Sequence, residues 1–287
     1  MTNLDIQRRY FAEEIQVIAN LQTDALVDAL ATVPRERFLP PGPWTIRSEV
    51  DFQAGPRQTP DAEPQRVYHN VAIAIDSSRM LFNGAPSLLA MAIDALKLKP
   101  GSRVLHVGTG PGYYTALMAR CVGPAGRVTG IEVDPSLAAT ARGLLSEMSW
   151  VTVQEGSAAG PFDQQFDAIL VNAGVTHPLP AWLDAVAPGG RLMLPLTAAM
   201  PGMGPIGKGF LMLVERPADD SPVWPARLVT MVAIYSAVGI RDDGLNMALG
   251  QAMQKQPFVR LKSMRRDDHE PGTSCWFHVP GACFSLS

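Results

Sequence analysis

Apolar and polar positions alternate from about residue 86 onward in a way that predicts helices and strands in turn. Helices are expected at 86–97, 113–121 and 135–148 and around Trp182. Short apolar runs typical of strands lie at 104–107, 128–132, 150–153, 168–171 and 191–195. Because strands and helices at this spacing are joined by right-handed crossovers, the pattern predicts an α/β fold with a doubly wound, mainly parallel sheet. Later strands at 210–214 and 228–235 are compatible with antiparallel pairing at the sheet edge.

The first 33 residues also have a helical pattern. Leu26, Leu30 and Val33 recur at helical spacing, and Pro34 marks the end of that helix. Residues 34–64 then carry seven of the 25 prolines, a density that excludes a long helix or a central strand. We therefore expect a meandering surface segment there.

Composition and charge narrow the class of protein. Of 287 residues, 47% are hydrophobic and 18% are charged, which is typical of a folded globular chain. The 24 basic and 27 acidic side chains leave a net charge of −3, so bulk attraction to nucleic acid or anionic lipid is not indicated. No apolar run approaches the roughly 18 residues that cross a bilayer, and no apolar segment follows a basic start at the N-terminus. We expect a cytoplasmic protein that binds neither nucleic acid nor a membrane.

The cysteines suggest no metal site. Cys121, Cys275 and Cys283 are odd in number, widely spaced and without a CxxC pair. Such spacing speaks against both a disulfide scaffold and a cysteine zinc site. We therefore expect no metal ligands.

A glycine loop is the most informative motif. Gly108, Gly110 and Gly112 lie between a predicted strand and a predicted helix. Glycines let the backbone approach a ligand closely, and the helix N-terminus offers free N–H groups to it. Glu132 follows twenty residues after Gly112, at the end of the next predicted strand, where a carboxylate can accept hydrogen bonds from ribose hydroxyls. This order of features favours a nucleotide-type cofactor site over a purely structural turn.

The segment 106–116, HVGTGPGYYTA, resembles motif I of class I S-adenosylmethionine-dependent methyltransferases. The variant is similar to that of the protein-L-isoaspartate O-methyltransferase family. Further segments agree with that family in order and spacing, at 33–40 (the "VPRxxFxP" motif), 122–132, 166–173 and 188–195. The resemblance spans about residues 10–240.

The resemblance implies a Rossmann-like methyltransferase sheet with helices on both faces, an N-terminal helical segment and a C-terminal extension. It divides the chain into a substrate-side segment at 1–85, a cofactor domain at 86–240, and a C-terminal helix and extension at 241–287. The implied cofactor is S-adenosyl-L-methionine. The residues that would bind it are His106, Gly108, Thr109, Gly110, Gly112, Tyr113, Glu132, Val133, Gly156, Ser157 and Asn172.

Three positions depart from the family pattern. His106 replaces an acidic residue; it is either a neutral ring that fills the strand end or a proton relay. Protonation of this ring near the cofactor is expected to weaken cofactor binding below about pH 6. Ser157 replaces the aspartate that flanks adenine. Gly84 stands where the family has a substrate-facing serine, so isoaspartyl methylation is expected to be weak. Asn83 is either a substitute hydrogen-bond donor or a turn residue.

The mechanism depends on the acceptor. A carboxylate acceptor is ionised at neutral pH, so methyl transfer to it needs alignment and no general base. An alcohol or amine acceptor would benefit from a base, and His177 is the candidate, unless it only begins the next helix. The candidate catalytic residues are thus Asn83, Gly84 and His177.

Three functions remain open from the sequence. The resemblance implies a carboxyl O-methyltransferase that acts on aspartyl or isoaspartyl groups of a peptide or protein. The acceptor could instead be a small metabolite or a modified peptide on the same fold. A cofactor-binding module without transferase activity is the third. The sequence does not determine the oligomeric state.

Overall fold

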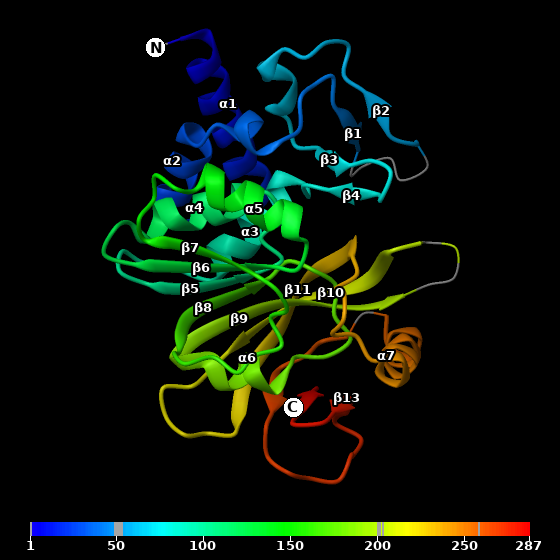
Figure 1. Cartoon of the computed structure of the whole chain (residues 1–287). Helices are drawn as coiled ribbons and strands as arrows, with labels where there is room; N and C mark the ends of the chain where they lie inside the picture. The colour runs from blue at the N-terminus through cyan, green and yellow to red at the C-terminus, as the bar shows by residue number, and fades with distance from the viewer. Residues whose placement is uncertain (1, 49–53, 200–201, 203, 258) are drawn as a thin grey trace. The chain divides into compact units, whose positions relative to one another are not determined.

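The computed structural model describes residues 2–48, 54–199, 202, 204–257 and 259–287 (Figure 1). The chain divides into two compact units. The first comprises Met1–Gly101 and Thr109–Glu155, and the second comprises Ser102–Gly108 and Gly156–Ser287. The three-part division at 1–85, 86–240 and 241–287 stays a prediction.

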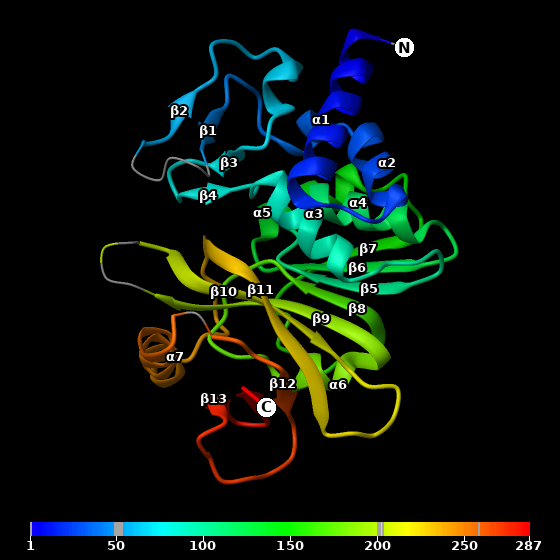
Figure 2. The same ribbon diagram turned by 180° about the vertical axis from the view of Figure 1, so that it is seen from behind.

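The first two helices of the first unit lie within the predicted N-terminal helical segment. The helices of this unit are α1 (Asn3–Ala19), α2 (Asp24–Thr32), α3 (Pro86–Ala95), α4 (Tyr113–Val122) and α5 (Pro135–Leu144), with short 3-10 helices at Arg35–Phe38 and Pro64–Val67. A capping box begins α1, because Thr2 and Asp5 each accept the other's backbone N–H. In both views α1 and α2 lie side by side (Figures 1 and 2), and Phe11, Ile15 and Leu26 are buried. The predicted N-terminal helical segment is confirmed.

The strands of the first unit form two groups. Strands β6 (Arg127–Glu132) and β7 (Val151–Glu155) run parallel. The others, β1 (Thr45–Arg47), β2 (Arg57–Gln58), β3 (Ala72–Asp76) and β4 (Leu81–Phe82), form a sheet in the order β2-β1-β3-β4, with antiparallel neighbours.

The proline-rich segment is more ordered than its composition suggests. Phe38, Trp44 and Ile46 are buried, and the Trp44 indole N–H donates to the Pro40 carbonyl at 2.7 Å. Prolines precede and follow the short strands rather than interrupting their hydrogen-bonded ladders. The expectation of a surface meander over 34–64 is therefore wrong for these residues.

The second unit is built on strands in the order β13-β14-β12-β11-β10-β9-β8-β5. They are β5 (Arg103–Val107), β8 (Phe166–Val171), β9 (Val186–Ala199), β10 (Ile206–Glu215), β11 (Val223–Tyr235), β12 (Ser263–Arg265), β13 (Cys275–Val279) and β14 (Ala282–Ser285), accompanied by α6 (Pro180–Ala185) and α7 (Asp243–Lys255). Strands β5, β8 and β9 pair in parallel, and each further pairing in this order is antiparallel. The antiparallel pairing expected for 210–214 and 228–235 is confirmed.

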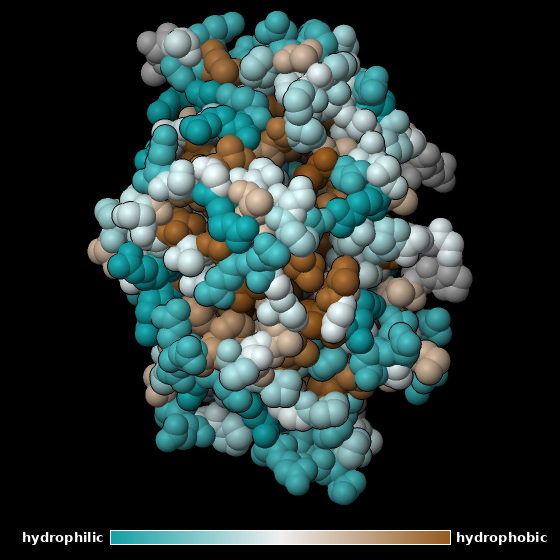
Figure 3. All heavy atoms as spheres, in the orientation of Figure 1, coloured by the Kyte–Doolittle hydropathy of each residue, from teal (hydrophilic) through white to brown (hydrophobic). Residues whose placement is uncertain are grey.

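The C-terminal part of this unit contains α7, within the segment where a C-terminal helix was expected, and three strands that the sequence did not predict. Its strands β12, β13 and β14 are short, and α7 lies beside β9 (Figure 2). At the lower end of the face in Figure 3, where Figure 1 places the loop between β12 and β13, the surface is hydrophilic. No helix among the described residues is long and apolar enough to span a membrane.

Candidate functional site

The glycine loop leads directly into α4. Gly110 and Gly112 have φ angles of 56° and 105°, a region that favours glycine. A Cβ atom on Gly112 would lie 2.9 Å from Cδ1 of Leu145, so the chain just after α5 leaves little room for a side chain there. Gly112 is also the N-cap residue of α4, where the first backbone N–H groups lack helical partners. The loop therefore has the conformation and the donors that the motif predicts.

Glu132 ends β6 and is anchored to this loop. The residue is 7% exposed, and its carboxylate accepts the backbone N–H of Gly110 at 2.7 Å and that of Asp134 at 3.0 Å, one on each oxygen. An ionised carboxylate has about four acceptor positions, so two remain for further donors. The side chain is thus held in one orientation and keeps the capacity to bind a pair of hydroxyl groups.

Val133 and Tyr113 differ in their environment. Val133 follows Glu132 and is 45% exposed, which makes its apolar side chain accessible to a ligand. Tyr113 is 1% exposed and packs against Phe38 and Tyr114, with ring centroids 5.8 and 5.1 Å away. Burial raises the pKa of Tyr113 far above its usual range, and its hydroxyl has no hydrogen-bond partner among the described residues. The phenol is therefore a neutral core group.

Asn83 and Gly84 follow β4, and neither residue lies in a turn. Asn83 is 5% exposed, and its Nδ2 atom has no hydrogen-bond partner in the part of the chain that the structure describes. The φ angle of Gly84 is not positive, and a Cβ there would lie 2.7 Å from Cδ2 of Leu89, the end of a flexible side chain. A buried, unsatisfied amide is uncommon in folded proteins and indicates a ligand, a water or a functional role. The turn interpretation of Asn83 does not fit this backbone, and its interpretation as a substitute hydrogen-bond donor stays a prediction.

The "VPRxxFxP" motif places a buried arginine next to these residues. Arg35 is fully buried, and its guanidinium donates to the carbonyls of Val67, His69 and Val71 at 2.8, 3.1 and 3.0 Å. A fourth contact reaches the Gly84 carbonyl at 3.5 Å. Arg35 therefore ties the segment after β4 to the chain around residue 70.

The second unit holds the remaining part of the glycine motif. Asn172, after β8, donates from Nδ2 to the Gly108 carbonyl at 3.4 Å. Gly108 has a φ of 79°, and a Cβ there would lie 3.2 Å from the Asn172 carbonyl oxygen. His106 in β5 is fully buried, and burial lowers its pKa to about 3. The ring is therefore neutral at physiological pH, and the expected weakening of cofactor binding below pH 6 loses its cause.

Three further predicted residues lie in the second unit. Gly156 has a φ of 134°, and the Ser157 hydroxyl accepts the backbone N–H of Ala159 at 3.3 Å. His177 is half-buried, and its Nδ1 lies 2.9 Å from Oγ1 of Thr176. Burial lowers the pKa of His177, although Asp242 opposes this shift. The imidazole is thus neutral at physiological pH and able to accept a proton.

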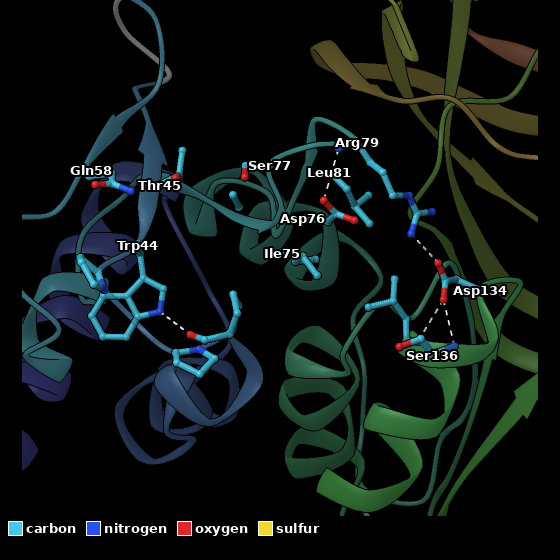
Figure 4. A pocket seen from close by; sticks show the side chains of 15 residues that line it. Trp44, Thr45, Gln58, Ile75, Asp76, Ser77, Arg79, Leu81, Asp134 and Ser136 are labelled. Carbon is cyan, nitrogen blue, oxygen red and sulfur yellow. Dashed lines mark hydrogen bonds and ion pairs between the residues drawn. The ribbon is translucent and has the colours of Figure 1, made fainter.

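A pocket of about 480 Å³ opens in the first unit (Figure 4). Its walls come from the chain around β1, from β3 and β4, and from the start of α5. Trp44 lies on one side, and the ion pair between Arg79 and Asp134, 2.6 Å long, lies on the other. Ile75 lines the pocket and also comes within 3.9 Å of the position that a Cβ on Gly110 would take. The pocket therefore adjoins the glycine loop and has a size typical of ligand sites.

Sequence reasoning singled out none of the residues that line this pocket as site residues, and the two that form its ion pair show why. Arg79 had no recognisable signal, because an isolated arginine between two short strands is common. Asp134 had one, since an aspartate before Pro135 is the usual start of a helix. Its carboxylate indeed caps α5 by accepting the N–H groups of Ser136 and Leu137.

Comparisons with known proteins agree with the motifs. A family model described as protein-L-isoaspartate(D-aspartate) O-methyltransferase matches residues 9–203. A protein-L-isoaspartate O-methyltransferase from one strain of Anaeromyxobacter dehalogenans is 40% identical over 162 residues, which are 53% of this chain and 73% of the relative. The enzyme of the same name from another strain is 33% identical over 222 residues, which cover 74% of this chain and 91% of the relative.

Solved structures support the same fold. A protein-L-isoaspartate O-methyltransferase superposes with a TM-score of 0.61 at 22% identity, covering 86% of this chain and 69% of the other. A protein of Plasmodium falciparum provisionally named as such an enzyme, in complex with S-adenosyl-L-homocysteine, gives 0.53 at 16% identity, covering 82% and 97%. The predicted α/β methyltransferase fold is confirmed, and so are the predicted enzyme class and cofactor at the level of the family.

Proposed function

Because the chain belongs to the protein-L-isoaspartate O-methyltransferase family, we propose that it transfers the methyl group of S-adenosylmethionine to the carboxylate of an isoaspartyl or aspartyl residue in a peptide or protein. The observation that carries the proposal is the Glu132 carboxylate, which two backbone N–H groups hold beside the glycine loop. A carboxylate at this point of an α/β sheet is placed to accept the hydroxyl groups of a ribose.

The first unit contains residues that would hold the cofactor. Glu132 has two unused acceptor positions, Val133 offers an exposed apolar contact for adenine, and Thr109 to Gly112 lead to the N-terminus of α4. The assignment of His106, Gly108, Tyr113, Gly156, Ser157 and Asn172 to the cofactor stays a prediction. When bound, S-adenosylmethionine supplies an electrophilic methyl group on a sulfonium, which leaves as a neutral thioether.

Asn83 is the residue that we assign to the acceptor. Its amide is buried and lacks a hydrogen-bond partner among the described residues, and it lies next to the glycine that replaces the family serine. An amide N–H can donate to a carboxylate as a serine hydroxyl does. Asn83 would thus orient the acceptor carboxylate, and Gly84 would leave room beside it.

The pocket is our candidate for the peptide that carries this carboxylate. Leu81 lines it two residues before Asn83 in the chain, and Asp134 lines it two residues after Glu132. The Arg79 side chain at its wall is 45% exposed, and its guanidinium can also pair with an acidic group of a peptide. Residues that line the pocket therefore lie two positions along the chain from each of the two proposed binding residues.

The chemistry asks little of the protein beyond alignment. The acceptor carboxylate is ionised at neutral pH, so no proton has to be removed from it. His177 would be needed as a base only for an alcohol or amine acceptor. A cytoplasmic location and the lack of nucleic-acid and membrane partners belong to the proposal, and they rest on the net charge of −3 and the hydropathy pattern.

The test is transfer of a labelled methyl group from S-adenosylmethionine to matched isoaspartyl and aspartyl peptides. Asn83→Ala should lower kcat/KM for the isoaspartyl peptide by about 10- to 150-fold, because it loses one hydrogen bond to a charged group. Gly84→Ser should raise it, since its φ allows serine and only the end of Leu89 must shift. Gly55→Ser is the matched control, because open space surrounds Gly55.

Other results would favour the alternatives. Methyl transfer to metabolites but to neither peptide would assign a changed acceptor. Binding of the cofactor without transfer to any acceptor tested would indicate a cofactor-binding module. An unchanged rate in Asn83→Ala would remove Asn83 from the acceptor site.

A further inference from the structure

We propose that His269, Cys275, His278 and Cys283 form a zinc site in the C-terminal segment. One donor atom from each of these side chains lies within 4.8 Å of each of the other three. In a tetrahedral site with Zn–S near 2.3 Å and Zn–N near 2.0 Å, neighbouring donor atoms are about 3.3–3.8 Å apart. The distance from Cys275 Sγ to His269 Nε2, 3.5 Å, already falls in this range. Small side-chain rotations would bring the remaining atoms to zinc.

The hairpin β13–β14 brings three of the four residues together. His278 is paired directly across the hairpin with Cys283, so their side chains leave the same face. Cys275 would point to the opposite face, because it precedes His278 by three residues. A β-bulge between Cys275 and Phe277 adds one residue to β13 and reverses that alternation. The irregular strand therefore places both cysteines beside one histidine.

The fourth residue is held by hydrogen bonds of its own. Nδ1 of His269 lies 2.9 Å from the Asp267 carbonyl oxygen, which can only accept, so Nδ1 carries the proton and Nε2 presents its lone pair. Arg265 pairs with the Asp267 carboxylate. The backbone N–H of Gly272 donates to Cys275 Sγ at 3.3 Å. Such hydrogen bonds to the ligands are a regular part of protein zinc sites.

A zinc ion at this site would have a structural role, because it would order the loop between β12 and β13. Residues 266–274 are almost entirely polar, and the surface they form is hydrophilic (Figure 3). Apolar burial therefore cannot order this loop, whereas an ion that joins His269 to the hairpin can. The segment also lies beyond residues 9–203, the part that the family model matches. Two thiolates and two imidazoles favour Zn²⁺ over harder cations, and binding releases the two thiol protons.

Metal analysis of the full-length chain tests the proposal. We expect one zinc ion per chain after purification with zinc present, and Co²⁺ in its place should give thiolate charge-transfer bands and the strong visible bands of tetrahedral cobalt. Cys275→Ser and Cys283→Ser should lose these bands, and His278→Gln should weaken Zn²⁺ binding by at least about 100-fold. Cys121→Ala and His69→Gln are the matched controls, because both residues lie in the other unit.

The cobalt spectrum of the unmodified chain keeps the test valid if a variant fails to fold. Chelation should also increase amide exchange in β12, β13 and β14 and leave α4 unchanged. Less than about 0.1 zinc per chain together with no cobalt charge-transfer band would overturn the proposal. A mass two hydrogens lower, with Cys275 and Cys283 joined in the freshly isolated chain, would overturn it in favour of a disulfide.

Discussion

Replacing Glu132 tests the cofactor site most directly. Glu132→Ala removes a carboxylate that has two free acceptor positions for ribose hydroxyls, besides its bonds to the N–H groups of Gly110 and Asp134. The loss of two charge-assisted hydrogen bonds costs about 2–4 kcal/mol of binding, which is about a 30- to 700-fold rise in Kd. Glu132→Gln should cost less, because one oxygen remains, although its NH₂ group must then face a backbone donor.

Isothermal titration calorimetry with S-adenosylmethionine and S-adenosylhomocysteine measures these effects. Circular dichroism on the same samples establishes that each variant is folded. Glu147→Ala is the control, since Glu147 is an exposed glutamate of the same unit. No binding heat with the unmodified chain, or the same Kd in Glu132→Ala, would refute the assignment of this carboxylate to the cofactor.

Two further predictions concern buried ionisable side chains. The pKa of His106 is about 3 in the folded chain and near 6.5 when unfolded, so the unfolded chain binds more protons between these values. The free energy of unfolding should therefore fall as pH drops below about 6.5, by up to about 1.4 kcal/mol per pH unit from this residue. Urea denaturation at pH 7 and pH 5 measures this fall, which should be smaller in His106→Leu than in the unmodified chain. Equal decreases in the two proteins would contradict the burial of His106. Arg35→Met leaves several buried carbonyls without their donor and should lower the free energy of unfolding by about 2–4 kcal/mol. Arg37 is exposed, so Arg37→Met should change it by less than about 0.5 kcal/mol. Similar losses of unfolding free energy in urea for the two variants would count against the role of Arg35.

The predictable part of the fold is the part that local periodicity determines. Strands such as β5 and β8 are short apolar runs between turn residues, and the helices α4 and α5 have clear starts at Gly112 and Pro135. The short strands around Trp44 were not predictable in this way, because two or three residues carry no period. Their order comes from burial against other parts of the unit, which a local pattern does not record.

The candidate site likewise has a part that local sequence predicts and a part that depends on tertiary structure. Gly110, Gly112 and Glu132 belong to one motif with a fixed spacing, so the contact between loop and carboxylate was predictable. The environment of His106 was not predictable, since a histidine at a strand end can be either buried or exposed to solvent. The cysteine–histidine cluster was hidden because it depends on a β-bulge, and strand alternation alone would separate Cys275 from His278.

The anchoring of Gly84 has a consequence for how specificity can change over evolution. Its carbonyl oxygen accepts from the Tyr114 hydroxyl at 3.1 Å and lies 3.5 Å from Arg35, and every amino acid has such an oxygen. The loop therefore keeps its course whichever side chain position 84 carries. If this loop contacts the acceptor as we propose, mutations at position 84 can alter acceptor preference while the chain stays folded, and Asn83 can recognise the acceptor before or after such a change. Because backbone atoms anchor this loop, its side chains can diverge while the residues that hold it stay the same.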